Sequence, residues 1–349
     1  MDDFWNSEAC AVDPLPLPDF AAPALEMQRE IPDKAALPVP PGPFSATLLR
    51  GDDQKQLVRL GPCEADGTAK SAEGVPCSLQ FINERLEYLF EKLPETPREL
   101  VETLGTAWCH PCVFKDVRPK VYDDLLSFCA LYTSRNRANK PVVMRILVVR
   151  MQELAASPAP TNPYEALAHT LALTVYHIIA CLDGDVESRA AAEATLSSLQ
   201  PAARSLIRHA NLGIEPTYPA TLQLYPLAET ESFWKSWILT ESIRRTMFFA
   251  HQFHACYLLL RGASPVDCRE MSKVQAWTLS APLWNADNAV DFAVAWGSKN
   301  RWIMTVSRCD GALEAAAPED VCKFGRLAMT CFMGRQEARG WFAARGGEL

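Results

Sequence analysis

The spacing of hydrophobic residues along the chain changes near position 78. Residues 1–77 show neither the two-residue period of a strand nor the 3.6-residue period of a helix, and they are rich in proline and alanine. From Ser78 onward, apolar residues recur at every third or fourth position, which is typical of amphipathic helices. We therefore expect a disordered, acidic tail over residues 1–77 and one helical domain over residues 78–349.

Proline and glycine signals divide the second region into successive helices. The predicted helices are residues 78–93, 98–105, 120–135, 140–156, 164–182, 186–210, 229–261 and 319–334. The helix 98–105 is expected to end at Gly105, and the helix 186–210 to be kinked or divided at Pro201. The helix 164–182 is apolar on nearly every side, which predicts a central position. Since no alternating strand pattern with hairpin signals occurs, the predicted class is all-α, a single domain of packed antiparallel helices.

Charge narrows the classes of function. The formal net charge is -8, and the dense basic stretches, Arg135–Lys140 and Arg244–Arg245, are short. Autonomous DNA binding needs a basic surface that neutralises phosphates, so direct contact with nucleic acid is not expected. The sequence contains no uninterrupted apolar run of about 20 residues, so we do not expect a membrane span. The acidic start resembles neither a secretory nor a mitochondrial signal. We expect a protein of the cytosol or nucleus.

Twelve cysteines are scattered through the chain, and without a secretory signal we expect reduced, mostly buried thiols. The run Trp108–Cys112 (WCHPC) resembles a thioredoxin-type redox pair, in which one thiol has a lowered pKa. That chemistry needs a preceding strand, whereas a helix is predicted there. Cys109 and Cys112 also have the spacing of half a zinc site, with His110 between them, but no second pair of this spacing occurs. Both chemistries are therefore disfavoured.

Two further groups of charged residues are candidates for metal binding or catalysis. Asp183 and Asp185 flank Gly184 at the end of a helix, as Mg²⁺ ligands do in some helical cyclases. The favoured interpretation is a turn in which Gly184 reverses the chain and Asp185 caps the next helix. Glu241 precedes Arg244 and Arg245 by three and four positions, which predicts ion pairs. A buried version would fix one arrangement of the helices rather than catalyse a reaction. The sequence thus predicts no catalytic residue, no cofactor and no metal.

The region around these arginines resembles a known family. In the helix 234–262 a pattern of matching positions, ended by a glycine, is similar to one in the large domain that follows the Zn₂Cys₆ DNA-binding cluster of fungal transcription factors. The matching residues are Trp234, Trp237, Glu241, Ser242, Arg244, Arg245, Thr246 and Gly262. Further similar blocks follow the family's order and are residues 129–147, 176–193, 278–296 and 318–329.

The resemblance implies an all-helical regulatory domain, nuclear and often dimeric, in a regulator of secondary-metabolite gene clusters. The sequence departs from the family at its start, where an acidic tail stands in place of the basic zinc cluster. We therefore expect action through protein partners, either a zinc-cluster transcription factor or the transcription machinery. The tail carries seven acidic residues and one arginine in its first 30 positions, which suits an activation segment or a solvated tail. The alternative hypotheses are a helical enzyme of a biosynthetic pathway and a ligand-binding protein without catalysis.

Overall fold

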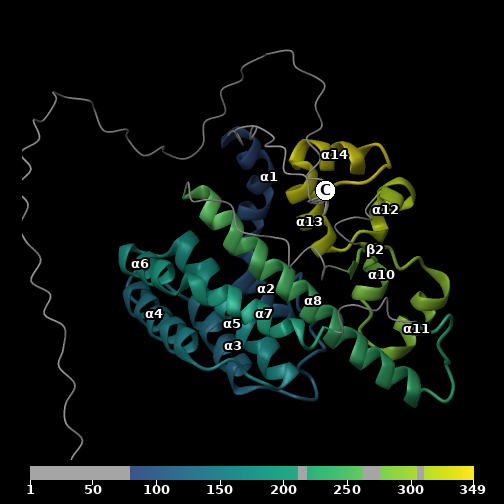
Figure 1. The fold of residues 1–349 in the computed structure, drawn as a ribbon, viewed down its shortest axis with the longest axis horizontal. Coiled ribbons are helices and arrows are strands. Elements are labelled where there is room, and N and C mark those ends of the chain that lie inside the picture. The colour runs from purple at the N-terminus through teal and green to yellow at the C-terminus, as the bar shows by residue number, and fades with distance from the viewer. Residues whose placement is uncertain (1–78, 211–217, 262–275, 305–309) are drawn as a thin grey trace, which may run out of the picture. The chain divides into compact units, whose positions relative to one another are not determined.

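The computed structural model describes residues 79–210, 218–261, 276–304 and 310–349, and their regular secondary structure is almost entirely helical (Figure 1). The first elements are α1 (Leu79–Lys92), η1 (Leu93–Glu95), α2 (Thr96–Thr103), α3 (Lys120–Thr133), α4 (Lys140–Ala156), α5 (Pro163–Asp183), α6 (Val186–Thr195), η2 (Leu196–Ser198) and α7 (Leu199–Ile207). They are followed by α8 (Ala228–Leu260), β1 (Trp277–Thr278), α10 (Ala281–Trp284), α11 (Ala289–Ser298), β2 (Ile303–Met304), α12 (Asp310–Ala315), η3 (Pro318–Asp320), α13 (Lys323–Met333) and α14 (Arg335–Ala343). The all-α class is confirmed. The predicted tail, residues 1–77, lies outside the described residues.

α5 forms the centre of the helical bundle. Its residues 166–180 are all buried, and it contacts α3, α4, α6, α7 and α8 (Figure 1). The side chain of Asn162 begins the helix by accepting the backbone N–H of Tyr164 at 2.9 Å. Within the described ranges, this helix alone is long and apolar enough to cross a membrane, but 83% of its apolar window is buried by the surrounding helices. Its hydrophobicity therefore belongs to a core helix.

The helix predicted at 186–210 is divided, but the predicted position of the break, Pro201, is wrong. α6 ends at Thr195, and the 3₁₀ turn Leu196–Ser198 leads into α7. Pro201 lies in the first turn of α7, where a backbone N–H has no partner within the helix. Proline therefore costs no hydrogen bond at this position, and the chain breaks before it.

The end of α2 also differs from the prediction. The helix stops at Thr103, and Leu104 follows it with a left-handed φ of 63°, its N–H donating to the carbonyl of Leu100. Gly105, expected as the stop, has another role, because a Cβ there would lie 2.9 Å from the carbonyl oxygen of Cys109. The glycine lets the WCHPC loop pack closely against the end of the helix.

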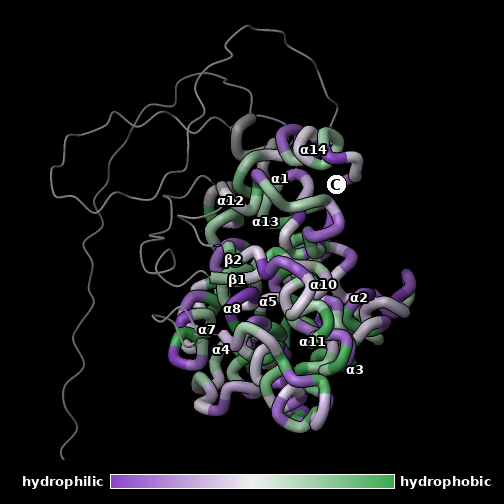
Figure 2. Tube along the Cα trace, turned by 90° about the vertical axis from the view of Figure 1, so that its right-hand side faces the viewer, coloured by the Kyte–Doolittle hydropathy of each residue, from purple (hydrophilic) through white to green (hydrophobic). Residues whose placement is uncertain are grey.

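The elements that follow α8 in the chain contribute further residues to the core. β1 and β2 form a two-residue antiparallel ladder, too short to give an alternating pattern in the sequence. α13 and α14 pack against α1, which brings the first and last described helices together (Figure 1). In Figure 2, α11 is coloured mainly hydrophobic, whereas α14 carries both hydrophilic and hydrophobic residues, as expected of an amphipathic helix with one exposed face.

The turn at Asp183–Asp185 is confirmed as a helix boundary. Asp185 caps α6 by accepting the N–H of Ser188 at 2.8 Å. Gly184 has an ordinary φ of -65°, so its requirement is space rather than conformation. A Cβ on Gly184 would lie 2.1 Å from the carbonyl oxygen of Ala180, a backbone atom with little room to move.

We expect Gly184→Ala to lower the free energy of unfolding by about 1–3 kcal/mol, because the added methyl group overpacks this turn. Denaturant unfolding followed by circular dichroism measures the change. Gly297→Ala is the matched control, since a Cβ there meets no atom within 4 Å and alanine favours the helix α11. Equal unfolding midpoints for the two variants would contradict the close approach at Gly184.

Candidate functional site

Several of the candidate residues from the sequence analysis lie around a buried ion pair in the middle of α8. Arg245 has no exposed surface and Glu241 is 2% exposed. One helical turn separates them, and Nε of Arg245 donates to Oε1 of Glu241 at 2.9 Å. The ion pair predicted from their spacing is therefore formed, in its buried version. The second predicted pair is weaker, because Nη1 of Arg244 lies 4.0 Å from Oε2 of Glu241.

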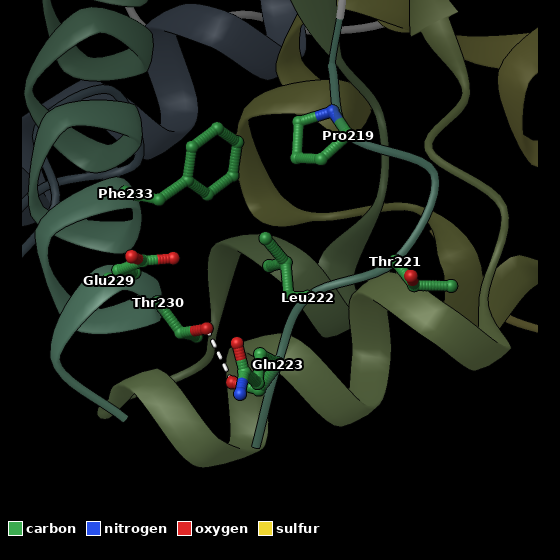
Figure 3. A pocket seen from close by; sticks show the side chains of 7 residues that line it. All are labelled: Pro219, Thr221, Leu222, Gln223, Glu229, Thr230 and Phe233. Atoms are coloured by element: carbon green, nitrogen blue, oxygen red, sulfur yellow. Dashed lines mark hydrogen bonds between the residues drawn. The ribbon is translucent and has the colours of Figure 1, made fainter. Parts of the chain in front are cut away.

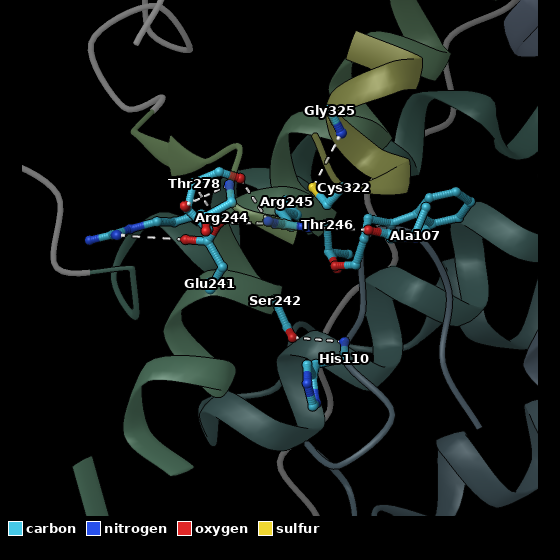
Figure 4. A network of polar contacts seen from close by, with 12 residues as sticks. Ala107, His110, Glu241, Ser242, Arg244, Arg245, Thr246, Thr278, Cys322 and Gly325 are labelled. Carbon is cyan, nitrogen blue, oxygen red and sulfur yellow. Dashed lines mark hydrogen bonds and ion pairs between the residues drawn. The ribbon is translucent and has the colours of Figure 1, made fainter. Parts of the chain in front are cut away.

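The ion pair binds backbone groups from distant parts of the chain (Figure 4). Nη2 of Arg245 donates to the carbonyl of Thr278 at 2.8 Å, and Nη1 donates to the carbonyl of Ala107 at 3.5 Å. The backbone N–H of Thr278 donates to Oε1 of Glu241 at 2.8 Å. The guanidinium also lies over the ring of Trp284, 3.6 Å from its centroid. One ion pair thus joins α8, the loop after α2, strand β1 and helix α10.

Ser242 and Thr246, on the same helix, bind the WCHPC loop. The backbone N–H of His110 donates to Oγ of Ser242 at 3.0 Å, and Oγ1 of Thr246 donates to the carbonyl of Trp108 at 3.3 Å. The indole of Trp108 stacks on the ring of Phe249 with centroids 3.7 Å apart. Side chains of α8 therefore hold the loop in place. These contacts were not predicted from the sequence.

The cysteines of this loop have the environment of structural thiols. Cys109 is buried, and burial raises its pKa well above the ordinary value, the reverse of what a redox thiolate needs. Cys112 is half-buried, and its pKa is also raised by burial and by the charge of Asp287. Both thiols are free, and among the described residues no cluster of three His, Cys, Asp or Glu side chains is placed to hold a metal ion. The loop follows α2 rather than a strand.

His110 is held neutral at the edge of the ion pair. Its pKa is lowered to about 4, first by burial and then by the charge of Arg245. Nδ1 accepts the backbone N–H of Cys112 at 3.1 Å, so Nε2 carries the proton. The ring meets Trp284 edge-on, with centroids 5.2 Å apart. The imidazole therefore packs as a core residue of the loop.

Asp183 forms a second, half-buried network where three helices meet. Its carboxylate accepts the hydroxyl of Tyr132 at 3.0 Å, Nη2 of Arg135 at 2.9 Å and Nζ of Lys140 at 3.0 Å. Burial by itself raises the pKa of Asp183, but the donors Lys140 and Tyr132 and the charge of Arg135 together hold it below the usual value. The carboxylate links the end of α5 to the loop between α3 and α4. These three donors account for the position of the Asp183 carboxylate without a role as a Mg²⁺ ligand.

An open pocket lies beside the first turns of α8. Seven described residues line it, namely Pro219, Thr221, Leu222, Gln223, Glu229, Thr230 and Phe233 (Figure 3). The loop that forms one wall is tied to the buried network, because Nη1 of Arg244 donates to the hydroxyl of Tyr218 at 3.2 Å. The pocket is partly polar and contains no tryptophan, so it differs from a dry, Trp-lined cavity for an apolar substrate.

Comparison with known proteins finds similarity to a transcription factor. No family model matches the chain, and no solved structure matches it. The chain is 29% identical over 264 residues to the protein named Transcription factor gsfR2, from Penicillium aethiopicum. The resemblance to a fungal transcription factor is confirmed. The aligned region covers 74% of this chain and 61% of that relative, so the chain spans about three fifths of the relative's length.

The residues that suggested a fungal transcription factor have a structural role. Trp234, Trp237 and the Glu241–Thr246 segment are all buried, and Gly262 lies outside the described residues. The pattern therefore marks how α8 is packed into the domain rather than a surface that contacts a ligand or DNA. No sequence signal marks the partners of Arg245 at Ala107 and Thr278, because both are backbone carbonyls.

Proposed function

We propose that the chain is a transcriptional regulator of a fungal secondary-metabolite gene cluster, acting in the nucleus through protein partners. The observation that carries the proposal is the match to a fungal transcription factor over 74% of the chain. The formal charge of -8 supports contact with partner proteins rather than with phosphates. The partners suited to this role are a zinc-cluster transcription factor, the transcription machinery or a second copy of the chain.

The helical domain serves as a rigid scaffold in this proposal. The Glu241–Arg245 pair holds segments from before and after α8 in one arrangement, so that partner surfaces on both sides keep a fixed geometry. Such a role needs no catalytic group. Among the described residues that line the pocket, Glu229 is the titratable side chain, and it has no neighbouring acid, base or nucleophile in the lining to form a catalytic pair.

The test is transcription in the fungus that encodes this chain. Deleting the gene is expected to lower the transcripts of a biosynthetic gene cluster, and the wild-type gene tagged with a fluorescent protein should restore them and concentrate in the nucleus. Restored transcripts are also expected from Lys235→Met, an exposed change on α8. Unchanged transcripts together with one accumulating pathway intermediate would overturn the proposal in favour of an enzyme.

A further inference from the structure

The pocket beside α8 has the size of a small-molecule site. Its volume is about 590 Å³, within the range of pockets that bury organic ligands. One wall is the first turns of α8, with Glu229, Thr230 and Phe233, and the other is the preceding loop (Figure 3). The side chains of Phe233, Leu222 and Glu229 point toward the space between the two walls.

The apolar wall is held in place by neighbouring rings. Phe233 meets Trp296 edge-on with centroids 5.3 Å apart and meets Tyr218 edge-on at 6.5 Å. The carbonyl of Pro219 accepts Nε1 of Trp296 at 2.9 Å, which fixes the loop against α11. The ring of Phe233 and the side chains of the loop therefore form a preorganised apolar surface, which lowers the entropic cost of binding a ligand.

Hydrogen bonds hold the polar end of the pocket in place. Thr230 is 2% exposed, and its hydroxyl donates to the carbonyl of Gln223 at 2.5 Å, which fastens the loop to α8. The side chain of Gln223 donates to the carbonyl of Tyr225 at 2.6 Å. The carboxylate of Glu229 has no ion-pair partner among the described residues, whereas the neighbouring acid Glu231 pairs with Lys235 at 2.9 Å. The pocket thus presents one unneutralised carboxylate beside an aromatic ring.

We propose that this pocket binds a small organic amine, with its ammonium group on Glu229 and its apolar or aromatic body against Phe233, Leu222 and Pro219. An ammonium gains both from the carboxylate and from the negative face of an aromatic ring. An anionic ligand is repelled by Glu229, and the described lining holds no lysine, arginine or histidine to bind it. The nearby Arg301 is occupied, since its guanidinium lies 4.2 Å from the ring centroid of Trp296 and Nη2 donates to the carbonyl of Pro219.

This ligand site goes beyond the proposed transcriptional role, and it is tested on the purified full chain without reference to transcription. Three indoles of similar size and different charge are the probes: tryptamine, the neutral tryptophol and the anionic indole-3-acetate. Ligand-observed NMR titration is expected to show saturable binding of tryptamine, weaker binding of tryptophol and the weakest binding of indole-3-acetate. Glu229→Gln should weaken tryptamine binding roughly fivefold and leave tryptophol binding unchanged, since an exposed charge pair contributes about one such factor.

Glu231→Gln is the matched control, because it removes an acidic charge two residues away that is outside the lining. It should leave the binding of all three indoles unchanged. A conservative change of the apolar wall, Phe233→Leu, should weaken tryptamine and tryptophol alike. The absence of saturable tryptamine binding, equal affinities for the three indoles, or equal effects of the two glutamate changes would each overturn the proposal.

Discussion

Replacing Arg245 by methionine is expected to lower the free energy of unfolding by about 3–5 kcal/mol, the range found when one partner of a buried ion pair is removed. The reason is the group left behind. Glu241 is 2% exposed and would lose its nearest cation, leaving the N–H of Thr278 as its hydrogen-bond donor and Arg244 as a weaker partner at 4.0 Å. The carbonyl of Thr278 would also lose the donor that Arg245 provides at 2.8 Å. Denaturant unfolding of the purified variant measures the loss.

Two comparisons separate the ion pair from the volume of the side chain. In the double variant Glu241→Gln/Arg245→Met both charges of this pair are removed, and Arg244 keeps the hydroxyl of Tyr218 as its partner at 3.2 Å, so part of the lost stability should return. Lys235→Met is the matched control on α8, since Lys235 pairs with Glu231 and Asp116 at the surface and its removal should hardly move the unfolding midpoint. A double variant as unstable as the sum of the single changes would show that the charges act independently, contrary to the network described.

Stability is also expected to fall as the pH drops from about 6.5 toward 4, because two fully buried histidines resist protonation. The pKa values of His110 and His177 are lowered from 6.5 to about 4, in both cases first by burial. Between these values the unfolded chain binds a proton that the folded chain does not, so acid favours unfolding. Each histidine then contributes on the order of 1.4 kcal/mol per pH unit inside this window, and nothing further below it.

His177→Gln isolates one of these contributions. Nδ1 of His177 lies 2.8 Å from the carbonyl of Leu173 and Nε2 lies 3.1 Å from Oγ1 of Thr195, so an uncharged amide suits the same site. Unfolding free energies measured across the pH range should depend less steeply on pH in the variant, by about 1.4 kcal/mol per unit between 6.5 and 4. Above that window the two curves should run parallel, which serves as the control. Equal slopes inside the window would show that His177 titrates normally in the folded protein.

Much of the local structure follows from the sequence, because its causes are local. The apolar stripes predicted the principal helices of the bundle, and the continuous apolar run of α5 predicted its central position. The cap at Asp185 follows from an acid placed directly before a helix. Pro201 was misread, since a proline breaks a helix interior but is tolerated in a first turn, and the sequence does not say where the first turn lies.

The all-α class, the central helix and the Glu241–Arg245 spacing that makes an ion pair all follow from the order of side chains along the chain. The burial of this pair depends on tertiary packing, and so do the backbone groups that it binds, 138 residues away at Ala107 and 33 residues away at Thr278. The same packing places Glu229 and Phe233 on an open pocket that is bounded by the loop at Pro219. The physical reason is that every residue carries the same backbone carbonyl. A contact with that group, or with a space between distant segments, leaves no pattern in the side chains along the chain.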